Sequence, residues 1–260
     1  MHEGGLLPLL IAGLFGALIG SFLNVCIYRL PRQESIAWPG SHCPKCSHPI
    51  AWYDNIPILS YSALCGRCRH CTVRIPFRYP LVEILNASGY VALLWVFGPS
   101  WVTVVYGLFY SALLVVAGTD FSHKIIPNAV TFPGIIVGLV CATTVLPLGF
   151  LDSLLGVLVG GGILWLLAWA SPYLFGKEGM GGGDIKLLAM IGAFLGWQPA
   201  LMTIMVGSLL GSLVGVTLIA AQVIKREDYI PFGPFLVCGA LVALFFGRSL
   251  LDWYQGLMAG

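Results

Sequence analysis

The sequence predicts an all-α, polytopic membrane protein with about eight transmembrane helices and a cytoplasmic zinc-binding loop. Hydrophobic residues make up 58% of the 260 residues and charged residues only 9%, whereas roughly 25% of the residues in a soluble domain are charged. So few charges cannot cover a surface in water. The apolar residues instead form runs of about 20, the length that crosses a bilayer core, and paired cysteines lie in the longest hydrophilic stretch.

Eight apolar runs, separated by charges or turn residues, are interpreted as membrane helices. Hairpin breaks are predicted at Gly98-Pro99, at 147–149 and at 196–199, where Gly and Pro cluster. The runs lie near residues 6–28, 81–98, 101–119, 128–148, 152–175, 184–198, 200–222 and 231–255. They predict three regions, which are a first transmembrane helix at 1–28, a loop at 29–80 and a membrane core at 81–260.

The basic residues predict the orientation of the chain. No basic residue precedes the first run and Arg29 follows it, which is typical of an uncleaved helix with its N-terminus outside and not of a secretory signal. In that orientation all 13 Lys and Arg residues except Arg248 lie in inside segments, in agreement with the positive-inside rule. The loop 29–80 is therefore expected on the cytoplasmic side.

The loop 29–80 has a net charge of +5, from seven basic residues against Glu34 and Asp54. Anionic lipid head groups are the expected partner of this charge. A nucleic-acid interface would need a basic surface with interleaved aromatic residues, free of the membrane, and this loop is too small and too rich in cysteine. No nucleic-acid partner is predicted.

Small residues recur at four-residue spacing in three of the apolar runs. Such spacing lets the backbones of membrane helices approach closely, so these glycines are expected to serve packing and not chemistry. They are Gly16 and Gly20, Gly156 and Gly160, and Gly207, Gly211 and Gly215.

Two C-x-x-C motifs in the loop predict a structural zinc site. Cys43-Pro-Lys-Cys46 is followed, after 21 residues, by Cys68-Arg-His-Cys71, a pattern typical of a four-thiolate zinc ion. Four thiolates leave no coordination position for water, so the zinc would stabilise the loop. Disulfides are disfavoured in reducing cytosol. Because Cys65 also forms a C-x-x-C motif with Cys68, the spacing leaves the second pair open.

Two acids, Asp120 and Asp184, are expected at membrane depth on the same side. Ionisable residues there are costly and usually functional. Asp184 follows three glycines, and the apolar run after it gives roughly 22 Å of helix, which is shorter than a hydrocarbon core of about 30 Å. Asp120 ends the third run. The pair predicts an aspartyl dyad, in which one carboxyl activates water and the other protonates the leaving group.

The helix ends suggest a division of roles within the dyad. Asp184 opens a helix, whose positive dipole end favours the ionised form, and Asp120 closes one, whose negative end favours protonation. The hypothesis is therefore that Asp184 is the general base and Asp120 the general acid, within a pair that titrates as a unit. The alternative without chemistry is a capped helix end and an acid in a loop.

Seven segments resemble, in order and spacing, those of the type IV prepilin peptidases, and together they extend over nearly the whole chain. One contains the Gly-x-Gly-Asp motif after which a class of membrane aspartyl proteases is named. The segments are Gly20-Ser-Phe-Leu-Asn24, Cys43-Pro-Lys-Cys46, Asp54-Asn-Ile-Pro57, Gly66-Arg-Cys68-Arg-His-Cys71, Arg78-Tyr-Pro-Leu-Val-Glu83, Asp120 to Asn128 and Gly179-Met-Gly-Gly-Gly-Asp-Ile-Lys186.

The resemblance implies an aspartic endopeptidase with catalytic Asp120 and Asp184, supported by Gly181, Gly183 and Lys186. It implies cleavage of type IV prepilins or type II secretion pseudopilins after a Gly, on the cytoplasmic side of the bacterial inner membrane. It also implies N-methylation of the new N-terminus with S-adenosylmethionine, because members with the peptidase activity alone have a reduced cysteine loop. Homo-oligomerisation is left open.

The resemblance also bears on the metal and the methyl donor. It favours Cys68 and Cys71 as the second cysteine pair, while Cys65 departs from the family pattern. The cysteine loop, the segment 20–24 and Glu83 are the candidates that it implies for the methyl-donor site, with Glu83 binding the new amino terminus. From the residues themselves no donor site is identified, since no glycine-rich strand-to-helix turn is present.

Recognition of a basic leader is expected away from the basic loop, at Glu178, Glu227 or Asp228, or through geometry alone. Two other functions compete with the peptidase. A proton or metal transporter would show internal repeats and buried charges near the midplane, which the sequence lacks. A non-enzymatic assembly subunit would leave the glycine-flanked Asp184 unexplained.

Overall fold

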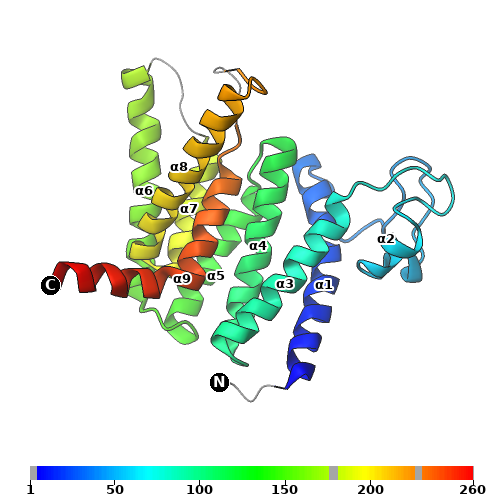
Figure 1. Ribbon diagram of the computed structural model, residues 1–260, viewed down its shortest axis with the longest axis horizontal. Helices are drawn as coiled ribbons and strands as arrows, with labels where there is room; N and C mark the ends of the chain where they lie inside the picture. The colour runs from blue at the N-terminus through cyan, green and yellow to red at the C-terminus, as the bar shows by residue number, and fades with distance from the viewer. Residues whose placement is uncertain (1–4, 176–180, 226–229, 260) are drawn as a thin grey trace. The chain divides into compact units, whose positions relative to one another are not determined.

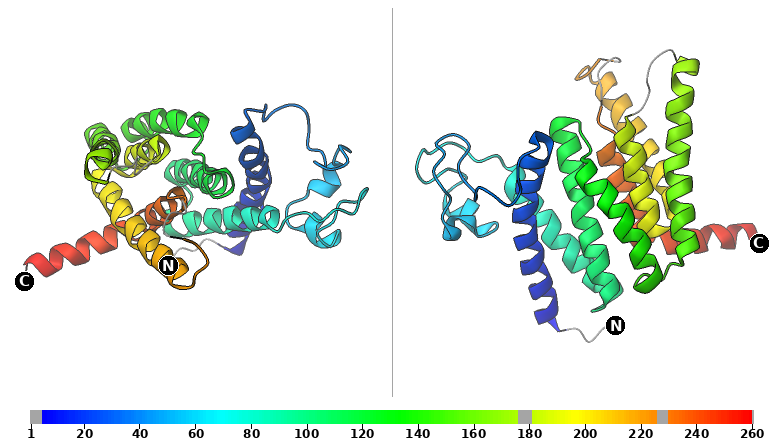
Figure 2. Two further views of the ribbon diagram at one scale, coloured as in Figure 1. Left: turned by 90° about the horizontal axis from the view of Figure 1, so that it is seen from above. Right: turned by 180° about the vertical axis from the view of Figure 1, so that it is seen from behind.

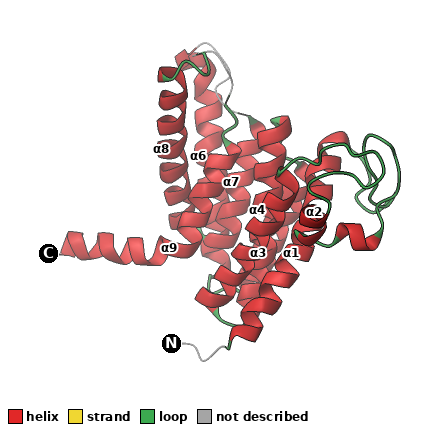
Figure 3. Cartoon of the chain, turned by 45° about the vertical axis from the view of Figure 1, so that its right-hand side comes forward, coloured by secondary structure: helices red, strands yellow, loops and turns green. Residues whose placement is uncertain are grey.

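The computed structural model describes residues 5–175, 181–225 and 230–259. Within these ranges every regular element is a helix (Figure 3), and the only β-type pairings are two isolated bridges. This confirms the predicted all-α class. The chain divides into two compact units, Met1–Val115 and Val116–Gly260, with the boundary inside one long helix.

The first unit contains two long helices, a loop with short helical turns and the start of a third long helix (Figure 1). The loop lies at the end of the unit where the first long helix ends and the next begins (Figure 1; Figure 2). The elements are α1 Leu6–Arg29, η1 Leu30–Arg32, η2 Trp52–Asn55, α2 Leu59–Ala63, α3 Arg78–Phe97 and the first part of α4 Trp101–His123.

The second unit contains the end of α4 and five further helices (Figure 1). The predicted breaks at Gly98-Pro99 and 147–149 fall between helices, whereas of 196–199 only Gly196 does, since α8 begins at Trp197. Gly98 and Gly196 have positive φ angles of +69° and +88°. The helices are α5 Asn128–Thr144, α6 Phe150–Phe175, α7 Gly182–Leu195, α8 Trp197–Ala220 and α9 Gly233–Ala259.

Eight apolar helices thus lie where the eight runs predict them, but not all are long enough to span a membrane. Among the described residues, six helices have the length and hydropathy of a span, namely α1, α3, α4, α6, α8 and α9. The apolar helix α5 has 17 residues and α7 has 14. The structure therefore gives six candidate spans, and the predicted count of eight is not confirmed.

The short helix α7 is enclosed by protein. Every residue from Leu187 to Phe194 is buried, and α7 packs against α5, α6, α8 and α9. A helix surrounded by other helices is shielded from lipid by protein, so it need not reach both faces of the bilayer. The helix is about 21 Å long at 1.5 Å per residue, and Asp184 in its first turn is buried among the helices.

Most of the spaced glycines lie at close helix contacts, as predicted, but a Cβ atom on Gly211 or Gly215 would meet only ordinary contacts of 3.4 and 3.5 Å. A Cβ atom on Gly20 would come within 2.7 Å of the Glu83 Cα atom in α3, and a Cβ atom on Gly156 within 2.2 Å of the Gly192 carbonyl oxygen in α7. Real Cβ atoms do not approach so closely, so only glycine permits these backbone distances. The contacts set the spacing of α1 with α3 and of α6 with α7.

Replacement of Gly156 by alanine is expected to destabilise the second unit. The added methyl group has no space against α7, and overpacking of this kind costs about 1–3 kcal/mol. Gly162 is the matched control on α6, because a Cβ atom there meets nothing within 4 Å. We expect Gly156→Ala to lower the melting temperature in detergent and Gly162→Ala to leave it unchanged or raise it. Equal melting temperatures for the two variants would contradict the packing role.

Candidate functional site

The cysteine loop is built from two hairpins of the same design. In the first, the Cys43 N–H donates to the His48 carbonyl at 3.0 Å and the Ser47 N–H to the Cys43 carbonyl at 2.8 Å. In the second, Cys68 N–H donates to Val73 at 2.9 Å and Thr72 N–H to Cys68 at 3.0 Å. Ser47 and Thr72 both have positive φ, 56° and 54°. Each C-x-x-C motif therefore occupies an equivalent tight turn.

The two turns bring four sulfur atoms together. The Sγ atoms of Cys43, Cys46, Cys68 and Cys71 all lie within 4.8 Å of one another, and those of Cys43 and Cys71 are 3.7 Å apart. Zinc–sulfur bonds of about 2.3 Å in a tetrahedron put sulfur atoms roughly 3.8 Å apart. The cluster therefore has the ligand chemistry and the spacing for a zinc ion.

Cys65 does not belong to this cluster. Its side chain is exposed, and its backbone has a φ of 48° in the turn before Gly66. The geometry thus agrees with the ligand set in which Cys68 and Cys71 form the second pair. All eight cysteines are free of disulfide bonds.

The cluster favours ionisation of one thiol, that of Cys43. Burial opposes ionisation of the Cys43 thiol, but hydrogen bonds from backbone N–H groups and from neighbouring thiols lower its pKa to about 6. For the Cys71 thiol the Val73 N–H lowers the pKa, but burial and the neighbouring thiols raise it to about 11. The thiolate is the form that binds metal. Cys43 is therefore available as a ligand at neutral pH, and the ion would draw the other three sulfurs into the same state.

Polar and aromatic contacts also hold the loop, but its buried core is small. Arg69 forms a two-pronged ion pair with Asp54, at 2.8 and 2.6 Å, whose hydrogen bonds lower the pKa of the Asp54 carboxyl. The rings of His48 and His70 lie 3.5 Å apart across the two hairpins. Between residues 33 and 77 only Cys43, Pro57, Ser60 and Gly66 are buried. A segment with so small a core depends on a metal or a similar constraint.

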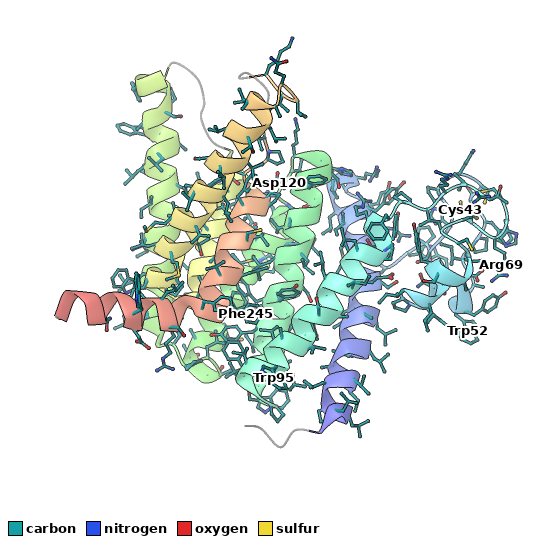
Figure 4. All side chains as sticks on the ribbon, in the orientation of Figure 1. Cys43, Trp52, Arg69, Trp95, Asp120 and Phe245 are labelled. Carbon is teal, nitrogen blue, oxygen red and sulfur yellow. The ribbon has the colours of Figure 1, made fainter. Side chains whose placement is uncertain are left out.

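In the second unit, Asp120 lies near the end of α4 (Figure 4) and is only 3% exposed. Its Oδ2 atom accepts a hydrogen bond of 2.9 Å from the backbone N–H of Gly233, the first residue of α9. A Cβ atom at position 233 would come within 2.6 Å of that same oxygen. Glycine at 233 therefore lets the amide reach the carboxyl.

Asp184 is buried in the first turn of α7, with 4% of its surface exposed. Gly181 is the N-cap residue of the helix, and Gly183 packs against Ile126, where a Cβ atom would come within 2.9 Å of the Ile126 Cβ. The Oδ1 atom of Asp184 has no hydrogen-bond partner among the described residues. Buried oxygen atoms without a partner are rare and call for an explanation.

The charge of Asp120 acts on Asp184, so the two carboxyls lie within electrostatic range of each other. The structure thus brings together the two acids that the sequence singles out, with Asp184 in the first turn of α7. The helix-end argument, however, does not separate their roles. Asp184 lies at the N-terminus of α7, and Asp120 also lies against the N-terminus of α9.

The predicted supporting residues have distinct positions. The Lys186 Nζ atom donates to the Asn128 side-chain oxygen at 2.7 Å and lies 5.4 Å from the centre of the Phe132 ring. It therefore ties the start of α7 to the start of α5. A Cβ atom placed on Gly181 would lie 3.7 Å from an Asp184 carboxyl oxygen, which is an ordinary van der Waals contact.

Sequence reasoning missed Gly233. It lies 113 residues from Asp120, in the segment Pro231-Phe-Gly-Pro234. A glycine between two prolines at the predicted start of a helix was the available signal, but nothing local connects it with Asp120. The three acids expected to recognise a leader, Glu178, Glu227 and Asp228, lie outside the described residues.

The family comparisons match most of the chain. Residues 14–97 match the bacterial peptidase A24 N-terminal domain, and residues 107–216 match the type IV leader peptidase family. Two proteins named "Prepilin leader peptidase/N-methyltransferase" are among the relatives. That of Aeromonas salmonicida is 38% identical over 93% of this chain and 91% of its own length, and that of Pseudomonas aeruginosa 37% identical over the same shares. No solved structure matches.

We expect the purified protein to contain about one zinc ion per chain, held by the four clustered thiolates. Cys43→Ser or Cys71→Ser should lower the zinc content severalfold, because each removes one of four ligands. Cys65→Ser is the matched control and should keep the metal. Zinc is measured by elemental analysis after gel filtration. A loss of zinc in Cys65→Ser with retention in Cys71→Ser would overturn this ligand set.

Proposed function

The chain belongs to the type IV leader peptidase family, and on that premise we propose that it cleaves the leader from type IV prepilins or type II secretion pseudopilins after a Gly residue. Asp120 and Asp184 are the proposed catalytic pair. The observation that carries this assignment is the buried, unpartnered Oδ1 atom of Asp184 beside a second buried carboxyl. An oxygen of this kind is placed to bind a water molecule or a peptide group.

In the proposed reaction the two carboxyls share one proton. The ionised one takes a proton from water, which attacks the carbonyl carbon of the peptide bond after Gly, and the protonated one gives its proton to the departing nitrogen. The two carboxyls can exchange the roles of base and acid, because they form one pair that titrates as a unit. Because each carboxyl lies at a helix N-terminus, we propose the dyad without a fixed assignment of base and acid.

The proposed orientation places the cysteine loop and the dyad on the cytoplasmic side of the bacterial inner membrane. Its support is the bias of Lys and Arg toward the predicted inside segments and the six candidate spans. The substrate's apolar helix would approach α7 and its neighbours from lipid. In that arrangement the leader junction reaches Asp120 and Asp184 from the membrane side.

The second proposed activity is N-methylation of the new N-terminus. Its support is the name of the relatives together with the complete four-cysteine cluster. S-adenosylmethionine would supply the methyl group as a sulfonium. The zinc would be structural, and it would hold the two hairpins in register against α1 and α3.

Substitution of either acid tests the peptidase. We expect Asp120→Asn and Asp184→Asn each to slow leader removal at least about 100-fold, since general acid–base catalysis contributes 10²–10⁴ in rate. Asparagine keeps the size of the side chain and an oxygen that can accept the Gly233 N–H. Asp152, an exposed acid in the first turn of α6, is the control, and Asp152→Asn should cut normally. The readout is shortening of a prepilin by purified protein in detergent.

If both variants still cut a prepilin at the wild-type rate, the acids are structural and the dyad is wrong. If the wild type cuts no pilin-like substrate under conditions in which it is folded and zinc-loaded, the peptidase assignment itself fails.

Gly233→Ala tests whether the α9 amide positions Asp120. The new methyl group would overlap the Asp120 carboxyl at 2.6 Å and must displace it. Misplacement of a catalytic group by about 1 Å can cost about 100-fold in rate, so we expect kcat to fall strongly with little change in KM. Gly247→Ala, on the same helix with nothing within 4 Å of the added atom, should retain full activity. A fully active Gly233→Ala variant would exclude the positioning role.

A further inference from the structure

The last part of α9 leaves the helix bundle. In every ribbon view the final turns of this helix point sideways out of the second unit, away from its other helices (Figure 1; Figure 2; Figure 3). The bend lies close to Phe245 (Figure 4). Of the α9 residues with described surroundings, Gly247 is the last buried one, and those from 248 to 256 are exposed except Leu251, which is partly buried. We call residues 248–259 the arm.

The arm is amphipathic. An α-helix turns by about 100° per residue, and at that angle the apolar residues of the arm occupy one continuous arc of roughly 160°, with the polar residues on the other side. Such a separation is typical of a helix that lies along the boundary between an apolar phase and water. The apolar residues are Leu250, Leu251, Trp253, Tyr254, Leu257 and Met258, and the polar residues are Arg248, Ser249, Asp252 and Gln255.

The apolar arc continues the lipid-facing surface of the same helix. Phe246 lies four residues before Leu250 and seven before Trp253, a spacing that puts all three on one helix face. Their exposed fractions are 61%, 39% and 65%. Since Phe246 lies within a candidate membrane span, lipid is the expected surrounding of its exposed ring. Leu250 and Trp253 extend that apolar surface beyond the bend.

The arm begins on the side of the membrane opposite the dyad. The helices α7 and α9 pack against each other, and both begin beside a carboxyl, with Asp184 in the first turn of α7 and Gly233 bonded to Asp120. The 14 residues of α7 extend over about 21 Å, and the 15 residues of α9 from Gly233 to Gly247 over about 22 Å. The arm therefore starts near the depth at which α7 ends.

The composition of the arm suits the surface of a bilayer. Trp and Tyr are enriched where a membrane meets water, and the arm contains Trp253 and Tyr254, while Trp197 begins α8 directly after α7 ends. The charges of Arg248 and Asp252 cancel, so the arm has no net charge that would attract anionic head groups. Free amphipathic helices use many basic residues to reach a membrane, but the preceding span already holds this arm there.

We propose that the arm lies on the membrane surface opposite the dyad, with its apolar arc among the lipid acyl chains and its polar residues toward water. In the proposed orientation this is the outer surface of the inner membrane. The apolar side of such a helix sinks about 5–10 Å into the boundary between head groups and acyl chains. Lipid, and not a second copy of the chain, thus covers the apolar face. The proposal does not depend on the peptidase reaction.

Photocross-linking tests which face of the arm meets lipid. The photoreactive residue p-benzoylphenylalanine replaces Leu250 or, as the matched control, Asp252, in the full chain reconstituted into vesicles of phosphatidylethanolamine and phosphatidylglycerol. We expect severalfold more lipid adducts from position 250 than from 252, because the two positions lie on opposite faces of the arm. Mass spectrometry of the chain measures the adducts. Equal yields at the two positions would overturn the proposal, and so would cross-links from 250 to a second copy or to another segment of the chain.

Hydrogen–deuterium exchange tests whether apolar contact holds the arm in place. In lipid nanodiscs we expect the amides of residues 248–259 to be protected, and Trp253→Glu to raise their exchange severalfold. Exchange of residues 233–247 should stay the same, which shows that the variant is folded, and the control Asp252→Asn should change neither segment. Protection is expected to be equal in phosphatidylcholine alone and with phosphatidylglycerol added, because the arm has no net charge. Slow, wild-type exchange in Trp253→Glu, or protection that requires anionic lipid, would contradict insertion of the apolar arc.

Discussion

The hydrogen bond from the Gly233 amide to Asp120 is the interaction on which the proposed active site depends. It links the end of α4 to the start of α9 and fixes one of two carboxyls that are both almost fully buried. Buried carboxyls are costly in a membrane protein unless backbone donors or other groups offset the charge. The enclosure of α7 by four helices follows from the same constraint, since it keeps Asp184 away from lipid.

The first unit is stabilised by close helix contacts and by its cysteine loop. Its helices pack through glycine contacts such as Gly20 with α3 and through buried polar bonds, including that from the Asn86 side chain to the Gly16 carbonyl at 2.7 Å. The loop between α1 and α3 has almost no core. Two equivalent tight turns and the cluster of four cysteine sulfur atoms hold the loop together in place of a hydrophobic core. Side chains of this loop, together with the facing ends of α1 and α3, line a cavity of about 230 Å³.

Sequence patterns that act locally predicted the structure well. Apolar runs located the eight helices, glycine spacing located tight helix contacts of α1 and α6, and the paired C-x-x-C motifs located the clustered sulfurs. The patterns could not show that α7 is enclosed by protein or that α5 ends after 17 residues. Both were therefore counted among the eight spans, although the run after Asp184 was already shorter than a hydrocarbon core. They also could not reveal contacts between distant segments. The contact of the Gly233 amide with Asp120 becomes visible only when the chain is folded, because it depends on packing between separate helices.

The choice of backbone donors around the dyad has a chemical reason. An Arg or Lys close to a carboxylate favours its charged form strongly, and a pair held permanently ionised could not pass a proton to a leaving group. Lys186 lies only two residues from Asp184, yet its Nζ atom binds Asn128. The α9 amide and the first turn of α7 instead provide partial positive charge. In the proposed mechanism this arrangement stabilises two buried carboxyls and still allows one proton to move between them.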